Sequence, residues 1–351
     1  MNGIVTCEMS TKNRRETTLP LAILSIALQT RPPEQLLIYD DNDEPMNLTA
    51  WDLEKKCRPP LWDYMFNLLK EKKIATTVIE GMKRGQHWNH EHAQSIAAGD
   101  LIWRMDDDTI AEPDCLKHLL AIMEDRVMSP TDSEPPPIGA VAPCVLFKSP
   151  NHMDIPADYT TKMDNAQWHY FEGVKEAEHL YSIFLYRKGI THYELALSKA
   201  AHREETIFSM KIRKAGYKLL IEPKALCRHF RFPTGGIRSP GYTKEMFDAD
   251  EKIFQEILAE ITTDTKTLHL NCGLGDHIVV KGLLPEIRAR YSKLKICACY
   301  PEVFKDEPNC ELMSIAEGNK ITNPERHHVY ALMGKLNWNK PLADIFRLVY
   351  L

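Results

Sequence analysis

A short apolar stretch that ends in three consecutive aspartates constrains the fold of this chain more than any other feature. Residues 101–105 read Leu-Ile-Trp-Arg-Met, and Asp106, Asp107 and Asp108 follow directly. An apolar run of this length is typical of a buried strand, whereas adjacent carboxylates repel one another and need water, a cation or a basic partner. The strand therefore has to end at the aspartates, at an accessible edge of a sheet.

Asp106 and Asp108 are two residues apart, so in extended backbone their side chains point to the same side. Two carboxylates on one side offer hard oxygen ligands to Mg²⁺ or Mn²⁺, ions that usually also bind substrate phosphates. The alternative is an acidic turn before a helix cap, with Thr109 and Asp114 near the start of that helix. The stretch alone leaves both interpretations open, and the flanking sequence favours the metal site.

Composition sets the broad class of the protein. The 351 residues suffice for one large domain or two ordinary ones, and 44% hydrophobic and 26% charged residues are typical of a globular protein. The net charge of −5 gives no general basic face for nucleic acid, although it leaves a local patch open. The nine cysteines are scattered without a CxxC pair, which indicates reduced thiols and a cytoplasmic protein. The apolar stretch at 19–28 is too short for a bilayer, so we expect a core helix and no targeting segment.

Strand and helix patterns alternate through the first hundred residues. The expected strands cover residues 3–7, 35–39, 75–79 and 101–105, and the expected helices cover residues 17–29, 61–72 and 89–98. This alternation predicts an α/β fold with a doubly wound, mainly parallel sheet flanked by helices. Ligands of such sheets bind beyond the carboxyl ends of the strands. Because residues 40–43 and 106–108 both follow strands, we expect the two acidic clusters at one edge.

The middle of the chain is less regular. Residues 138–143 and 181–186 are expected strands, and the polar, aromatic stretch 151–173 is either a lid or acceptor loop or a surface excursion. Glu204 and Glu205 then open a helix that ends at Gly216. Two acids at a helix N-terminus are favoured by the helix dipole, so helix capping competes with a catalytic role.

Basic residues follow the expected strands at 218–221 and 225–227. His229 is either a metal ligand or an ordinary core or surface histidine. Arg228, Arg231 and Arg238 form a basic cluster that could clamp a diphosphate.

The style of the sequence changes after an expected helix at 244–261. A strand at 267–270, a glycine turn at 271–276, a helix to residue 291 and a strand at 294–299 begin a second α/β unit. Its Gly273-x-Gly275 resembles half of a nucleotide-binding turn but lacks the third glycine. We therefore expect a first domain over residues 1–243, a connecting helix over 244–265 and a small accessory α/β domain over 266–351, which ends in an amphipathic packing helix.

The order of these features over residues 1–240 resembles the family 2 glycosyltransferases of the GT-A fold, a Rossmann-like fold. Asp40-Asp41 stands where that family binds the base and ribose, and Arg84-Gly85 precedes the helix that leads to the Asp106-x-Asp108 motif. Glu204-Glu205, followed by residues 211–217 (KIRKAGY), is similar to the acidic pair of the family ahead of its R-x-x-x-A-G-Y helix, although the family often has Glu-Asp.

The resemblance implies a role for each matching position. It makes Glu205 the general base and Asp106, Asp108 and His229 the ligands of Mn²⁺ or Mg²⁺. It further implies donor contacts from Thr6, Asp40, Asp41, Arg84, Asp106, Asp107, Glu204 and Arg231.

The function that the resemblance implies is metal-dependent, inverting transfer of a sugar from a nucleotide-diphosphate sugar, expected to be a UDP-sugar, to an acceptor hydroxyl. That hydroxyl belongs to a glycan or to a modified, hydroxymethylated base, since two-part chains of this kind resemble bacteriophage proteins. Residues 266–330 resemble the N-terminal start of GT-B heptosyltransferase-like proteins, whose donor site lies mostly in the other lobe. We therefore expect this part to serve acceptor binding or assembly.

Two other functions compete with this interpretation. A non-catalytic nucleotide-sugar- or carbohydrate-binding module would make the C-terminal part the working one, but it would not need intact Asp106, Asp108, Glu205 and His229. A nucleotidyltransferase usually carries a glycine- and lysine-rich phosphate loop near its first strand. Residues 6–15 contain no glycine, so this class ranks third.

Overall fold

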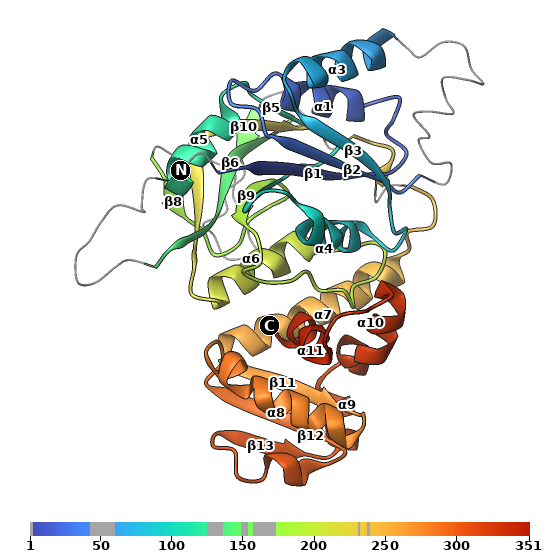
Figure 1. Ribbon diagram of the computed structural model, residues 1–351, viewed down its shortest axis with the longest axis vertical. Coiled ribbons are helices and arrows are strands. Elements are labelled where there is room, and N and C mark those ends of the chain that lie inside the picture. The colour runs from blue at the N-terminus through green and yellow to red at the C-terminus, as the bar shows by residue number, and fades with distance from the viewer. Residues whose placement is uncertain are drawn as a thin grey trace.

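The computed structural model describes residues 3–42, 60–124, 136–148, 154–156, 173–230, 232–236 and 239–351. Two α/β units form the two ends of an elongated molecule, and three helices lie between them (Figure 1). These helices are α7 (Lys244–Thr262), α10 (Val329–Leu336) and α11 (Leu342–Tyr350). The expected fold class, a mainly parallel sheet flanked by helices with a small C-terminal α/β unit, is confirmed.

The large sheet has the strand order β3-β2-β1-β4-β9-β6-β10-β5. The first four strands are parallel, β9 runs antiparallel to both β4 and β6, and β6 is parallel to β10. The bounds are β1 Val5–Thr11, β2 Gln35–Asp40, β3 Ala75–Glu80, β4 Leu101–Arg104, β5 Thr109–Ala111, β6 Ile138–Lys148, β9 Phe184–Arg187 and β10 Lys218–His229. Two short strands join its edges, β7 (Asp154–Pro156) beside β6 and β8 (Lys175–Glu176) beside β10.

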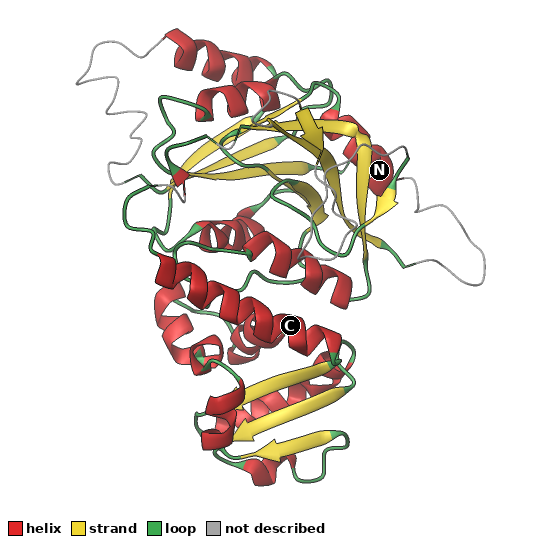
Figure 2. Ribbon diagram, turned by 180° about the vertical axis from the view of Figure 1, so that it is seen from behind, coloured by secondary structure: helices red, strands yellow, loops and turns green. Residues whose placement is uncertain are grey.

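Helices cover both faces of this sheet (Figures 1 and 2). One face carries α1 (Leu19–Ala27), α3 (Pro60–Glu71) and α5 (Cys115–Glu124), and the face toward the small unit carries α4 (Gln86–Ile96) and α6 (Glu204–Lys214). Helix α1 packs on the sheet through an apolar face. Its buried side chains Leu19, Ala22, Ile23 and Ile26 recur at helical spacing and join the main core.

The first strand is longer than its apolar residues indicate. Val5, Cys7 and Met9 point to one face and are fully buried in the core. Glu8 lies on the other face, equally buried, where its carboxylate is 2.6 Å from His90 Nδ1 of α4. The strand therefore runs to Thr11 and not to Cys7, because a buried, hydrogen-bonded Glu8 replaces the apolar side chain that sequence patterning requires.

The small unit is a three-stranded parallel sheet of β11 (Thr265–Leu270), β12 (Lys293–Ala298) and β13 (Cys310–Met313). Helices α8 (Leu274–Arg288) and α9 (Ile315–Ile321) and two short 3₁₀ helices, η2 (Pro301–Phe304) and η3 (Pro324–His327), complete it. The expected packing helix at the end of the chain is confirmed, since α11 buries Ile345, Phe346, Leu348 and Tyr350.

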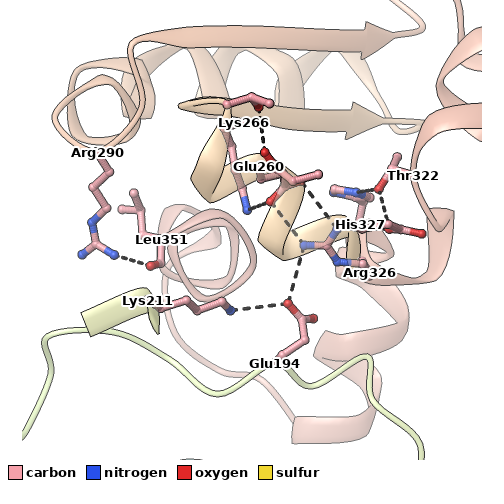
Figure 3. A network of polar contacts seen from close by, with 12 residues as sticks. Glu194, Lys211, Glu260, Lys266, Arg290, Thr322, Arg326, His327 and Leu351 are labelled. Atoms are coloured by element: carbon pink, nitrogen blue, oxygen red, sulfur yellow. Dashed lines mark hydrogen bonds and ion pairs between the residues drawn. The ribbon is translucent and has the colours of Figure 1, made fainter. Parts of the chain in front are cut away.

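Buried charges join the two units (Figure 3). Glu194 and Lys211 come from the large unit, and their charged atoms lie 3.4 Å apart. Arg326 of η3 lies 3.8 Å from Glu194 and 3.4 Å from Glu260 of α7, which also contacts Lys266 at 3.0 Å. None of these five side chains is more than 9% exposed. Because a buried charge is costly when it loses its partner, the network fixes one arrangement of the two units.

In the described part of the chain, every helix is too short or too polar to cross a bilayer.

Candidate functional site

A cavity of about 370 Å³ opens at the carboxyl ends of the first strands of the large sheet. Parallel strands bring these ends to one edge, so residues that are distant in the sequence meet there. The residues of the cavity wall come from the ends of β1, β2, β4 and β10 and from the start of α6, and include Thr11, Lys12, Arg14, Asp41, Asp106, Asp107, Asp108, Glu205 and His229.

Pairing of β5 with β10 brings His229 to the aspartates. The register sets His229 opposite Thr109, and Phe230 N donates to Asp108 O at 2.9 Å. His229 Nε2 lies 3.2 Å from Asp108 Oδ1 and 3.5 Å from Asp106 Oδ2. One ligand atom of each of the three residues falls within 4.8 Å of the others. Two carboxylate oxygens and an imidazole nitrogen form a donor set that fits Mn²⁺ or Mg²⁺.

The backbone at the aspartates is a turn and not the extended chain that we expected. Thr109 N donates to Asp106 O at 3.2 Å. The turn still directs Asp106 and Asp108 to His229, while Asp107 between them accepts from the Thr11 hydroxyl at 2.7 Å and from Arg14. Asp107 is therefore held by the chain itself, although it also lines the cavity.

Burial and mutual charge shift the pKa values of this cluster. Burial alone would raise the pKa of Asp106, but the hydrogen bond from His229 and the charge of Arg104 hold it well below its usual range. Burial alone would lower the pKa of His229, but the two aspartates raise it to about 9. Burial raises the pKa of Asp107 to about 6, although Arg14 opposes the shift.

Arg14 is a site residue that the sequence analysis did not assign. Its Nη2 lies 3.1 Å from Asp108 Oδ2, its Nη1 contacts Asp107, and the residue is 5% exposed. The loop at Gly235 gives it room, because a Cβ there would lie 2.6 Å from Arg14 Cγ. The feature of the sequence that could have indicated Arg14 is the basic loop at residues 12–15, directly after the first strand.

The two aspartates after β2 differ in position. Asp41 lines the cavity and accepts from Lys83 N and from Asn89 Nδ2, both at 2.9 Å. Burial is the largest influence on Asp41 and raises its pKa. Asp40 is 1% exposed, is absent from the described cavity wall, and accepts from Asn42 N at 3.0 Å.

Two residues predicted to contact the donor, Thr6 and Arg84, are absent from the described wall of this cavity. Thr6 lies near the amino end of β1, where its hydroxyl donates to Gln35 Oε1 at 2.8 Å. Arg84 turns to α10, where it donates to Lys335 O at 3.1 Å, and it lies 5.0 Å from the centre of the Trp88 ring. Arg231 lies outside the described residues.

The acidic pair of α6 splits into two roles. Glu204 is fully buried, where it forms an ion pair with Arg104 and accepts from Gln86 Nε2 at 2.9 Å. Glu205 is partly exposed and lines the cavity. Glu205 is thus the member of the pair that faces the cavity, and Glu204 faces the protein interior. Arg104, which secures Glu204, was read from the sequence only as part of a strand.

The glycine turn of the small unit serves its own helix. Asp276 Oδ2 accepts from Gly273 N at 2.9 Å, and Asp276 Oδ1 accepts from the Tyr330 hydroxyl at 2.6 Å. A carboxylate thus stands where a phosphate-binding turn would hold its ligand.

Comparison with known proteins relates the first part of the chain to one protein family. Residues 8–129 match the model of glycosyl transferase family 2. The match runs from β1 to the end of α5 and includes Asp41 and Asp106–Asp108. For this segment, the resemblance that the motifs indicated is confirmed. Curated proteins gave no match to the chain.

Solved structures extend the likeness in fold beyond that segment. GalNAc-T7 with UDP, GalNAc and Mn²⁺ is 13% identical with a TM-score of 0.50, over 75% of this chain and 50% of that one. The chain thus spans half the length of GalNAc-T7. S. aureus TarS 1–349 in complex with UDP-GlcNAc is also 13% identical with a TM-score of 0.50, over 95% of this chain and 81% of that one. The large unit therefore has the fold of the GT-A glycosyltransferases.

Proposed function

We propose that this protein is a metal-dependent, inverting glycosyltransferase that moves a sugar from a nucleotide-diphosphate sugar to an acceptor hydroxyl. One observation carries the proposal: a carboxylate–carboxylate–imidazole set and a separate accessible carboxylate, Glu205, line one cavity, and the two carboxylates of the set, Asp106 and Asp108, lie in the segment that matches family 2. A metal site and a general base at one cavity are what transfer from a diphosphate donor requires.

The donor would lie across the strand ends. Asp41 would accept hydrogen bonds from the base or ribose, and Lys12 and Arg14 offer positive charge to the diphosphate. We propose a UDP-sugar, because GalNAc-T7 and TarS were solved with UDP and UDP-GlcNAc. Asp106, Asp108 and His229 would hold Mn²⁺ or Mg²⁺, which when bound neutralises the charge of the leaving diphosphate.

The transfer step is a single displacement. The Glu205 carboxylate takes the proton of the acceptor hydroxyl, whose oxygen forms a bond to the anomeric carbon. The bond from that carbon to the diphosphate oxygen breaks on the opposite side, and the nucleoside diphosphate leaves with the bonding electrons. A single displacement by the acceptor oxygen inverts the configuration at the anomeric carbon.

The acceptor hydroxyl belongs to a glycan or to a modified DNA base. Both offer a hydroxyl that is not acidic enough to attack without a base. The rival from another class is a non-catalytic nucleotide-sugar-binding module. Such a module would bind donor in the same way but would release no nucleoside diphosphate from it.

Donor binding by calorimetry tests the proposal. UDP-, GDP- and dTDP-sugars are titrated with and without Mn²⁺, and release of nucleoside diphosphate is then measured with the donor that binds. We expect one nucleotide to bind tightly only with metal, and slow hydrolysis of that donor. Binding of no donor under either condition would reject the glycosyltransferase proposal. Binding without any turnover in the presence of acceptors would favour the module.

A further inference from the structure

A second, larger cavity of about 530 Å³ lies between the two units. Its walls come from the turn before α4, from the loop at residues 194–199, from α7, and from η3, α10 and α11 of the C-terminal part. Figure 1 shows α10 beside α7, below the large sheet and α4. We call this cavity the interdomain cleft. Its volume is in the range of ligand pockets and is too small for a nucleic-acid duplex.

The interdomain cleft is basic in a protein whose net charge is −5. Lys83, Arg84, Lys199 and Lys335 line it and are exposed, whereas the exposed carboxylate among its described lining residues is Glu325 alone. The two other acids of the lining are buried and engaged. Glu194 pairs with Lys211, and Asp250 accepts from Ser198 N and His202 N. Lys83 lies 3.5 Å from the exposed Glu80, a pair that solvent weakens, so the lining keeps an excess of positive charge that a ligand can reach.

The lining offers almost no ring surface to a ligand. Among the described residues of the cleft wall, Trp88 is 3% exposed and lies under the guanidinium of Arg84, which leaves the imidazole of His328 as the exposed ring. Single-stranded nucleic acids are bound by stacking of bases on exposed aromatic rings. Apolar side chains such as Leu197, Ile253 and Leu332 form the rest of the wall. The cleft thus suits a flexible anionic chain without aromatic groups.

The cleft adjoins the cavity that holds Glu205. Lys199 lines both, and its ammonium lies 5.6 Å from the ring of Tyr242, which lines the Glu205 cavity. Gly85, at a φ of 106°, lets the backbone pass close to Lys199, because a Cβ there would lie 2.9 Å from Lys199 O. A chain bound in the cleft can therefore place one of its hydroxyls near Glu205.

Contacts within the protein hold the walls of the cleft together. Arg326, a cleft residue, belongs to the buried charge network that joins the units, and Arg84 donates to Lys335 O across the cleft (Figure 3 shows the network). Walls that are fixed in this way bind a flexible chain without the additional cost of ordering themselves.

We infer that the interdomain cleft binds an extended glycan acceptor that carries phosphate groups and presents its hydroxyl to Glu205. The inference rests on the proposed glycosyltransferase function and names its acceptor class. Helix α10 of the C-terminal part then serves acceptor recognition, because it supplies the wall that carries Lys335.

Binding of inorganic polyphosphate, in metal-free buffer, tests the inference. The wild type should bind it with an affinity that falls as salt is added, since screening weakens charge contacts. A Lys83→Asn/Lys335→Ala variant should bind about tenfold more weakly, the loss expected for two exposed charge contacts. Asparagine is chosen because Lys83 has a φ of 56°, which asparagine tolerates. The matched control Lys305→Ala/Lys320→Ala removes two exposed lysines of the small unit outside the cleft and should bind as the wild type does.

Each contrary result overturns the inference. These results are no binding of polyphosphate, equal binding by the cleft variant and the wild type, or displacement of polyphosphate by UDP. Tighter binding of a DNA oligonucleotide, single-stranded or duplex, that is lost in the cleft variant would replace the glycan chain by nucleic acid. Donor binding, measured separately with Mn²⁺, should be the same in all these variants. Normal donor binding with failed polyphosphate binding would reject the cleft and leave the proposed function standing.

Discussion

Arg104 and Glu204 form a fully buried ion pair that joins the turn of Asp106–Asp108 to the start of α6, which carries Glu205. Arg104 is the last residue of β4, two positions before Asp106, and Glu204 is the first residue of α6, directly before Glu205. The guanidinium also lies 3.7 Å from Asp106 Oδ1. One side chain thus sets the distance between the carboxylates that would act on the donor and the carboxylate that would act on the acceptor.

Removing one member of this pair should destabilise the protein strongly. Arg104→Met leaves the Glu204 carboxylate buried without its cation, and we expect the free energy of unfolding to fall by about 3–5 kcal/mol. The Arg104→Met/Glu204→Met double variant should lose less than Arg104→Met alone. Urea unfolding measures both. The control is Arg347→Ala, which breaks a half-exposed pair with Glu286 and should cost about 1 kcal/mol or less. Similar losses in the control and in Arg104→Met would contradict a special role for the buried pair.

Glu205→Gln should abolish transfer and leave donor binding intact. The amide keeps the size of the side chain but cannot accept the acceptor proton. The measurement is release of nucleoside diphosphate in the presence of acceptor, together with donor calorimetry. Glu245→Gln is the matched control, because Glu245 is also a first-turn glutamate, of α7, and is exposed. If both variants kept near-normal turnover, Glu205 would be a helix-capping charge only.

Asp108→Asn should remove metal-dependent donor binding. The amide keeps the shape of the contact with Arg14 but is a weaker ligand for a hard cation, so we expect Mn²⁺ affinity to fall about 10- to 100-fold. Calorimetry with Mn²⁺ alone and then with donor separates the two effects. Asp114→Asn, an exposed aspartate that contacts Thr30, serves as the control. Unchanged Mn²⁺ binding by Asp108→Asn would exclude Asp108 as a ligand.

The contribution of His87 to the free energy of unfolding should fall as the pH drops below about 6.5. Burial is the largest influence on His87 and lowers its pKa from 6.5 to about 3, so the folded state holds this ring neutral while the unfolded state takes up a proton. The stabilisation is complete above the unfolded pKa and is lost as the pH falls, by about 2 kcal/mol at pH 5 for this group. His327, also buried with a lowered pKa, adds to the same trend.

The check is the free energy of unfolding between pH 7.5 and 5, in His87→Gln and in the wild type. We expect a smaller pH slope in the variant, whatever its absolute stability. His328→Gln, at an exposed ring, should keep the slope of the wild type. An identical slope in His87→Gln and the wild type would show that His87 does not carry the effect.

Much of the fold could be predicted from local patterns. The alternation of apolar strands and amphipathic helices indicated the parallel sheet, since each element has to bury one face or stripe. The strand at Leu101–Arg104 and the aspartates after it were placed correctly, because adjacent carboxylates cannot continue a buried strand. The sequence pattern predicts that the first strand ends at Cys7, whereas β1 runs to Thr11. The difference arises because Glu8 is buried against His90, a partner that lies far along the chain.

The sequence by itself determined the α/β class, the acidic edge and the glutamate pair at the start of α6, because these follow from residue type and spacing. Only the tertiary structure decided which polar side chains share the cavity. Antiparallel pairing of β5 with β10 brought His229 to Asp108, and the loop after β1 brought Arg14. Thr6 lies at the amino end of β1, away from the cavity, and Arg84 contacts Lys335 of α10. Such contacts depend on strand register and domain packing, which are set by the whole core and not by neighbours in sequence.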